Sequence, residues 1–280
     1  MRRFVVTLLA LGLFPVAAAA QRPCETDLRS RPVGPLQVGE LDGFLAVPHR
    51  ACPREELALG GDMLLVAHSD ELYGNLHVNG RGRFSGFLGD PRVEAFVSWE
   101  AFRYQSLLSA VSASYIGLGY LSWGVSGQLY EGEHIAYALT GRMVLPTTTG
   151  LDVNSQPLAM DVGLTAAWRP NATFRFHIWV TALGSLGIGE GPPDPRGGLR
   201  VGGGVDLRIA EWLSLVAELQ SGFLYRAALD VFAVNAGVRL ALGSEVGLEL
   251  GAALPIFGDR AFDDGALPIA ASLMLSWHRR

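Results

Sequence analysis

The sequence contains no lysine, only two cysteines and few charged residues of either sign. Its 22 basic residues are all Arg and stand against 27 acidic ones in 280 residues, a net charge of −5. Charged residues make up 18% and hydrophobic residues 49% of the chain, and this apolar content excludes a disordered protein. The acidic balance argues against a nucleic-acid binder. The 35 glycines follow no three-residue period, which excludes a collagen-like chain.

Long apolar runs are missing beyond the first twenty residues. No later stretch of 18 or more apolar residues occurs, which excludes a helical membrane protein. The N-terminus begins with Arg2-Arg3, continues with the apolar run 4–16 and ends in Ala17–Ala20. A basic start, a short apolar core and small residues predict a secretory signal peptide cleaved after Ala20. An uncleaved anchor is the alternative, disfavoured because the run is short for a spanning helix.

The two cysteines, Cys24 and Cys52, both precede the patterned part of the chain. In an exported protein such a pair predicts a disulfide, here closing a loop that would stabilise the fold by about 3 kcal/mol. Two free thiols are the alternative. We therefore expect three parts: a signal peptide at 1–20, a periplasmic segment with the Cys24–Cys52 disulfide at 21–56, and a barrel at 57–280.

Apolar and polar-or-small residues alternate strictly over long stretches of the second half. Between 199 and 209, for example, the odd residues are apolar apart from Gly203, and the even residues are Arg, Gly or Asp. Period-2 alternation over ten residues predicts strands longer than those of globular sheets and typical of transmembrane barrels. The expected strands are 57–67, 72–88, 91–105, 111–129, 133–146, 157–168, 173–188, 199–210, 213–225, 229–242, 245–256 and 267–278.

These segments predict an all-β fold, a closed antiparallel up-and-down transmembrane β-barrel of about twelve strands, with ten also possible. Tight turns near 90, 132, 170, 211 and 243 alternate with longer connections, which assigns the tight turns to the periplasm and the long ones to the outside. A soluble sandwich or lipocalin-like barrel is the alternative. It would place polar residues, not apolar ones, on the outward face.

Aromatic residues occur near both ends of the expected strands, as in the girdles of membrane barrels. The predicted girdle residues are Trp168, Phe174, Phe176 and Trp277 at the periplasmic ends, and Phe223 and Tyr225 at the outer ends.

If the apolar face meets lipid, the charged face lines the lumen. The candidate lumen or constriction residues are Asp206, Arg208, Glu218, Arg239, Glu249, Arg142, Asp161, Arg175 and Arg200. Pairing Leu242 with Val246 across the tight turn aligns Arg239 with Glu249. Pairing Ile209 with Leu213 aligns Asp206 with Val216.

We therefore expect Arg239, Glu249, Asp206 and Glu218 to cluster in the periplasmic half of the lumen. The cluster is interpreted either as compensated charges that brace a narrow barrel or as a constriction that filters solutes by charge. Many other inward positions are small, among them Gly202 and Gly204, and such residues leave room for a narrow pore. The 21–56 segment could instead fold inward and block it.

Enzymatic and metal chemistry find little support. The six histidines show no metal-ligand spacing, so no metal and no cofactor is expected. His68-Ser69 lies at an outer barrel edge where lipid-modifying chemistry occurs, but adjacent strand residues point to opposite faces. We expect no enzyme, with a lipid-modifying enzyme as the third hypothesis.

The overall arrangement resembles bacterial outer-membrane β-barrels, specifically porin-like transporters. The stretch GRMVLPTTTG at 141–150 is similar to a strand-end L-P-T-G stretch of the phenol-degradation-pathway transporter family, with extra Thr residues. Trp277 stands where a terminal aromatic is expected, but His278-Arg279-Arg280 follow it. The resemblance implies passage of a small solute. The expected partners are outer-membrane lipid, an unknown small solute and the barrel-assembly machinery of a Gram-negative bacterium, with no nucleic acid and a monomeric state. A non-transporting structural or adhesion barrel with ligand-binding outer loops is the second hypothesis.

Overall fold

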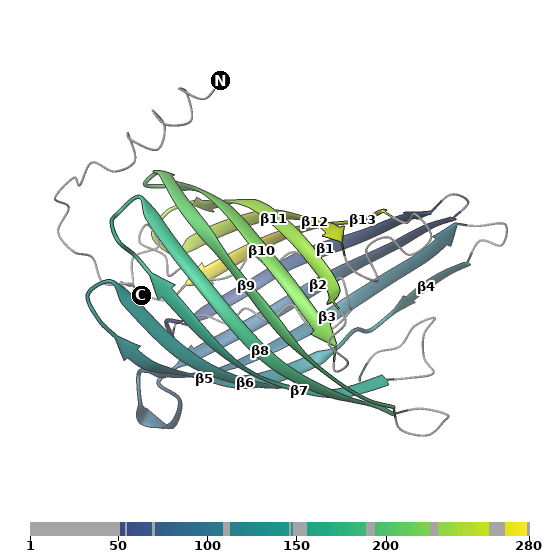
Figure 1. The fold of residues 1–280 in the computed structure, drawn as a ribbon, viewed down its shortest axis with the longest axis horizontal. Helices are drawn as coiled ribbons and strands as arrows, with labels where there is room; N and C mark the ends of the chain where they lie inside the picture. Colours follow the sequence, from purple (N-terminus) through teal and green to yellow (C-terminus); the bar gives the residue numbers. More distant parts are fainter. Residues whose placement is uncertain are drawn as a thin grey trace.

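The computed structural model describes residues 51–53, 55–68, 71–108, 113–145, 147, 156–188, 194–224, 229–257 and 267–278. Nearly all of these residues lie in antiparallel strands (Figure 1). The strands are β1 (Glu56–His68), β2 (Glu71–Ser85), β3 (Val93–Leu108), β4 (Ala113–Gly117), β5 (Leu121–Glu131), β6 (Ile135–Leu145), β7 (Gln156–Trp168), β8 (Phe174–Ile188), β9 (Asp194–Ala210), β10 (Leu213–Leu224), β11 (Leu229–Ala241), β12 (Val246–Phe257) and β13 (Leu267–His278).

The sheet closes into a barrel because its first and last strands pair with each other. Glu56 of β1 pairs with His278 of β13, and the other strands pair in chain order except that β5 pairs with β3 and not with β4. β4 and β5 both pair with β3 and occupy one position around the barrel, so thirteen strands make twelve positions. The predicted closed twelve-stranded meander is confirmed.

The expected single strand 111–129 is wrong in one respect, because it is interrupted between β4 and β5. Residues 118–120 leave regular strand geometry, although Glu100 of β3 still exchanges backbone hydrogen bonds with Gly119 and Tyr120. A Cβ on Gly119 would overlap the Glu100 carboxylate, so the small residue makes room for that side chain. The interruption is therefore the place where an inward carboxylate folds back onto the wall.

Thr147 completes the hydrogen bonding of the backbone beside this interruption. Its hydroxyl accepts a hydrogen bond from the Leu121 N–H (2.9 Å) and donates one to the Gly119 carbonyl (3.0 Å). The Thr147 N–H in turn donates to the Leu145 carbonyl at 2.8 Å. The first Thr of the PTTTG stretch thus satisfies backbone groups that strand pairing leaves open.

The turn between β2 and β3 is longer than predicted. β2 ends at Ser85 instead of residue 88, and a 3₁₀ turn (Phe87–Gly89) precedes β3. Beyond it, Arg92 donates hydrogen bonds to the Asp90 carboxylate, and these bonds lower the pKa of Asp90 below its ordinary value. Both residues are exposed, so this pair lies on the surface outside the barrel wall.

Leu88 in this turn has φ +59°, the left-handed region, and its side chain is 85% exposed. A non-glycine residue there costs about 1 kcal/mol. We expect Leu88→Gly to raise the free energy of unfolding by up to that amount, measured by urea titration of the refolded protein. Gly86→Ala at φ +76° is the opposite control and is expected to lower it. A stability loss in Leu88→Gly would mean that lipid contact of the side chain outweighs the strain.

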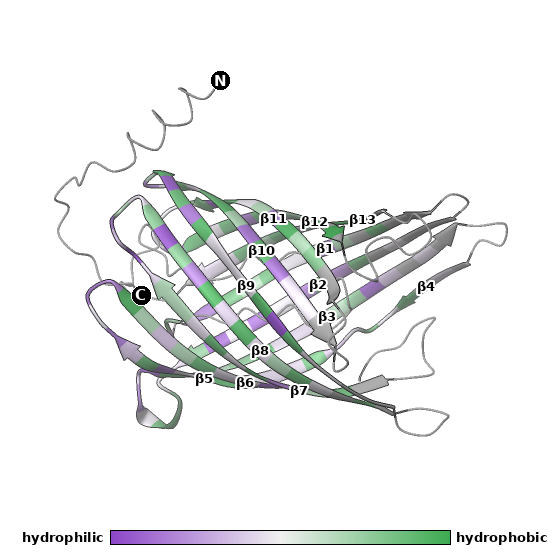
Figure 2. Ribbon diagram, viewed as in Figure 1, coloured by the Kyte–Doolittle hydropathy of each residue, from purple (hydrophilic) through white to green (hydrophobic). Residues whose placement is uncertain are grey.

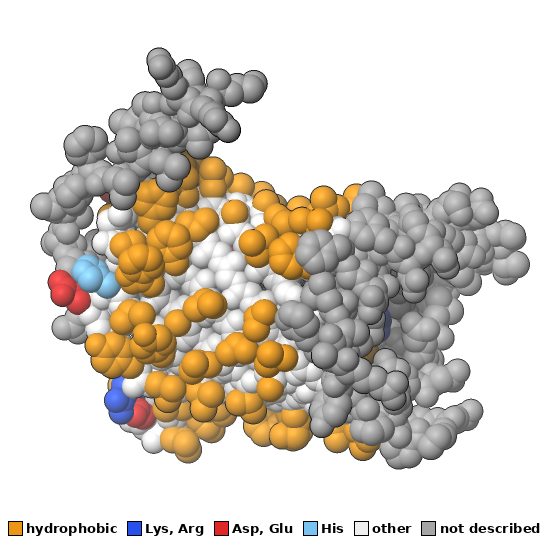
Figure 3. All heavy atoms as spheres, in the orientation of Figure 1, with side chains coloured by type: hydrophobic (Ala, Val, Ile, Leu, Met, Phe, Trp, Pro, Cys, Tyr) orange, Lys and Arg blue, Asp and Glu red, His pale blue; other side chains and the backbone are white. Residues whose placement is uncertain are grey.

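The barrel is apolar outside and polar inside. Side chains that are 40–65% exposed on the outer face include Leu59, Val97, Trp123, Val162, Ile178, Leu219 and Leu273. Figure 3 shows hydrophobic side chains spread over the visible face of the wall, and Figure 2 shows the alternation of hydropathy along the strands. So large an apolar surface is typical of a wall that faces lipid. Among the described residues, no helix has the length and apolar character needed to cross a membrane.

Candidate functional site: a charged barrel lumen

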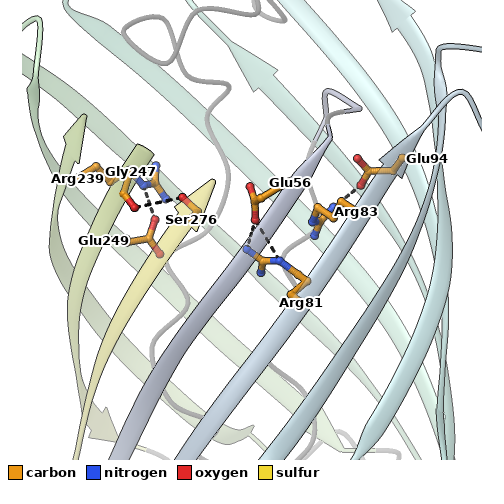
Figure 4. Close-up of polar contacts among 8 residues, drawn as sticks. All are labelled: Glu56, Arg81, Arg83, Glu94, Arg239, Gly247, Glu249 and Ser276. Carbon is orange, nitrogen blue, oxygen red and sulfur yellow. Dashed lines mark hydrogen bonds and ion pairs between the residues drawn. The ribbon is translucent and has the colours of Figure 1, made fainter. Parts of the chain in front are cut away.

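The predicted charge cluster is present in the lumen. Arg239 donates from Nε to Glu249 Oε2 at 2.7 Å and from Nη1 to Asp206 Oδ2 at 3.1 Å. All three side chains are largely buried. The guanidinium of Arg239 on β11 therefore bridges a carboxylate on the adjacent β12 and one on β9, which lies beyond β10 (Figure 4 shows its bond to Glu249).

The hairpin registers explain this meeting. Leu242 donates its N–H to the Val246 carbonyl at 2.9 Å, and the same register aligns Arg239 with Glu249, as predicted. Asp206 is aligned with Val216, also as predicted. The reason given for that alignment is wrong in detail: Leu213 pairs with Ala210 and not with Ile209, because a register shift follows Leu213.

Glu218 extends the cluster on the other side. Its carboxylate accepts a hydrogen bond from Asn235 Nδ2 at 3.3 Å and lies 3.1 Å from His177 Nε2. It also interacts electrostatically with Arg239. Asn235 was not among the predicted residues, although its inward position follows from the same alternation that places Arg239.

The remaining predicted lumen residues lie on β6 to β9. Arg142 and Asp161 are cross-strand partners, with Nη2–Oδ2 at 2.7 Å, and Arg200 interacts electrostatically with Asp161. Arg175 is aligned with Asp206 and has Arg208 nearby. Each predicted charge thus faces a partner of opposite sign or a charged neighbour in the lumen.

A second set of charges lies on β1 to β3; the alternation predicts an inward Glu94, whereas Glu56, Arg81 and Arg83 were not among the predicted residues. Glu56 pairs with Arg81, and Arg83 pairs with Glu94 (Figure 4). The Arg83 guanidinium also lies 5.1 Å from the centroid of the Phe96 ring. The signal was available, since Arg81 and Arg83 alternate with outward residues along β2 in the sequence HVNGRGRF.

Nearer the middle of the barrel, His77 lies between two carboxylates. Its Nδ1 is 2.9 Å from Asp62 Oδ1 and its Nε2 is 3.3 Å from Glu100 Oε1. Asn79 donates to Asp62, and Arg103 lies 3.8 Å from Glu100. His77 continues the alternation of Arg81 and Arg83 along β2, but Arg103 does not follow simple alternation, because a register shift in the β2–β3 ladder changes the face on which it lies.

The small inward residues do not leave the room that was expected. A Cβ added to Gly202 would lie 2.5 Å from the Trp179 ring, and one added to Gly204 would lie 2.5 Å from Glu218 Cγ and 2.9 Å from His177 Cε1. The expectation that these glycines widen the lumen is wrong at both positions. They accommodate large side chains of neighbouring strands, so this part of the lumen is densely packed.

Three of the aromatic residues predicted for the periplasmic girdle lie side by side. Trp168 and Phe176 stack with ring centroids 5.1 Å apart, and Phe174 follows at 6.4 Å from Phe176. Trp168 and Trp277 are nearly half exposed. The side chain of Phe223, and Tyr225 as a whole, lie outside the described residues.

Other predicted features fall partly outside the described part of the chain. Cys24 and Ser69 lie there, so the disulfide and the His68-Ser69 hypothesis remain predictions. Within the described residues, no group of three or more His, Cys, Asp or Glu side chains is arranged to hold a metal ion.

Comparisons with known proteins place the fold among outer-membrane barrels. No protein-family model matches the chain, and no curated protein matches its sequence. The COG4313 outer membrane channel from Pseudomonas putida F1 superposes with a TM-score of 0.59 at 9% identity, covering 86% of this chain and 99% of that one. The NanC porin superposes with a TM-score of 0.51 at 7% identity, covering 79% and 100%. At such identities the likeness shows the fold alone.

Proposed function

We propose that the chain forms a narrow outer-membrane pore for small polar solutes. The observation that carries this proposal is the distribution of side chains on the barrel wall. Apolar side chains compatible with lipid lie outside, and carboxylates, guanidiniums and hydroxyls lie inside. A barrel with a purely structural role could fill its interior with apolar side chains. Ion pairs and hydroxyl pairs such as Ser126–Thr140 (2.8 Å) instead supply hydrogen-bonding partners along a solute's path.

The two similar structures, an outer membrane channel and a porin, support the same proposal at the level of fold. They leave the solute open. The dense packing around Glu218 and Arg239 limits the passage to small molecules, and it also favours the second candidate, a closed structural barrel.

Single-channel recording of the refolded mature protein in a planar bilayer tests the proposal. Discrete conductance steps are expected, and a KCl gradient gives the reversal potential. Arg200→Ala is expected to shift that potential toward cation selectivity, because it removes a partly accessible positive charge beside Asp161. The matched control is Arg92→Ala, which removes an arginine from the periplasmic turn and should leave selectivity unchanged. If the protein is folded and heat-modifiable but produces no conductance steps, a structural barrel without an open lumen is the better account.

A further inference from the structure

The residues just before β1 lie inside the barrel. Ala51 and Cys52 are buried, with 0% and 1% exposure, and they form one apolar cluster with Ala136 and Ala167. Ala136 belongs to β6 and Ala167 to β7, and the two are direct cross-strand partners. Both face inward, because the neighbouring Trp168 is exposed on the outer face.

This contact requires the chain to cross the lumen. β7 lies five positions from β1 around the barrel, through β2, β3, β5 and β6. With strands about 4.8 Å apart, five spacings amount to about 24 Å along the wall. The four Cα–Cα steps from Cys52 to Glu56 reach at most about 14 Å when extended. The segment therefore runs as a chord through the interior and not along the wall.

The receiving wall is shaped for this approach. Ala136 and Ala167 lie side by side and carry only methyl groups, so the chain can approach the wall more closely there than it could over a larger pair. Backbone and small side chains can pack there at the density of a protein core, which excludes water from the contact. Ala51 and Cys52 thus have a defined contact site on β6 and β7.

We infer that residues 51–53, here called the strap, form the periplasmic constriction of the lumen, seated on Ala136 and Ala167. The inference rests on the proposed pore, which it deepens by naming the element that limits solute size. The charge cluster of Arg239 then lines the passage, while the strap divides its periplasmic mouth.

Disulfide trapping tests the contact of the strap with Ala136 and Ala167 and needs no conductance measurement. In a Cys24→Ser background, which leaves Cys52 without its predicted partner, Ala136→Cys or Ala167→Cys should form a bond to Cys52 under mild oxidation, seen by mass spectrometry of the folded band. Ala138→Cys is the matched control, since it is buried and inward on the same strand but outside the cluster. Equal trapping at Ala138, or none at either cluster position, would overturn the strap.

Conductance then tests its role. Ala167→Phe is expected to displace the strap and raise single-channel conductance severalfold, whereas Ala138→Phe only fills the lumen and should lower conductance or leave it unchanged. If Ala167→Cys forms the disulfide with Cys52 but Ala167→Phe conducts like the wild-type protein, the strap is not the constriction. If the cysteine variants form the disulfide but the wild-type protein gives no conductance, the proposed pore is wrong and the strap closes the lumen.

Discussion

Arg239→Met is expected to lower the free energy of unfolding by about 3–5 kcal/mol, the usual cost of breaking a buried ion pair by removing one partner. The substitution keeps most of the side-chain volume but leaves Asp206 and Glu249 without the guanidinium that bridges them. The two carboxylates would then face each other across a poorly solvated lumen. Urea titration of the refolded protein in lipid vesicles, followed by tryptophan fluorescence, measures the change.

The chain supplies its own control for this experiment. Arg92 also pairs with an aspartate, Asp90, but both side chains are well exposed in the turn after β2. Surface pairs of this kind contribute little to stability, so Arg92→Met should leave the unfolding curve unchanged. If both variants unfold like the wild-type protein, water already solvates the Asp206–Arg239–Glu249 cluster, and its role lies in the passage of ions and not in bracing the wall.

Gly124→Ala is expected to destabilise the barrel by about 1–3 kcal/mol through overpacking. A Cβ at this position would lie 2.5 Å from Phe96 Cζ and would overlap the carbonyl oxygen of Gly141. Phe96 is itself buried over this site, beneath Arg83. Neither the ring nor the strand backbone can withdraw without disturbing its own contacts, so the strain remains in the folded state.

Gly127→Ala on the same strand is the matched control. No heavy atom lies within 4 Å of a Cβ built there, so the variant should be as stable as the wild-type protein or gain up to about 1 kcal/mol from a less flexible unfolded chain. Phe96→Leu is expected to recover part of the Gly124→Ala loss, since it withdraws the ring. Equal stability of Gly124→Ala and Gly127→Ala in urea titration would show that β5 shifts freely against β6.

Much of the fold was predictable from local pattern. Alternation assigned Asp206, Arg239 and Glu249 to the lumen, and the tight turn at 243 aligned Arg239 with Glu249. Both inferences need only neighbouring strands and a short connection. The register within such a hairpin is well determined, because a shift of one residue would turn the apolar side chains inward. The second half of the chain was read more accurately than β1 to β5 because its alternation is less interrupted.

Other features escaped sequence reasoning because they depend on closure or on a shift in register. The inward position of Arg103 near His77 follows a register shift between β2 and β3, and Glu56 contacts Arg81 along a diagonal and not directly across the ladder. The glycines were taken as empty space, yet Trp179 covers Gly202 from the neighbouring strand. Residue size at one position says little about free volume when the next strand supplies the filling side chain.

Which face of most strands meets lipid and which meets the lumen follows from the sequence alone, because side chains alternate with a period of two along any extended chain. The sequence also determined the pairing within tight hairpins. The closed barrel alone shows that within the predicted cluster one guanidinium, that of Arg239, bonds both Asp206 and Glu249, and that Ala51 and Cys52 contact β6 and β7. These contacts join residues across several strands or across the whole barrel. Their distances follow from the curvature of the closed wall, which no local pattern records.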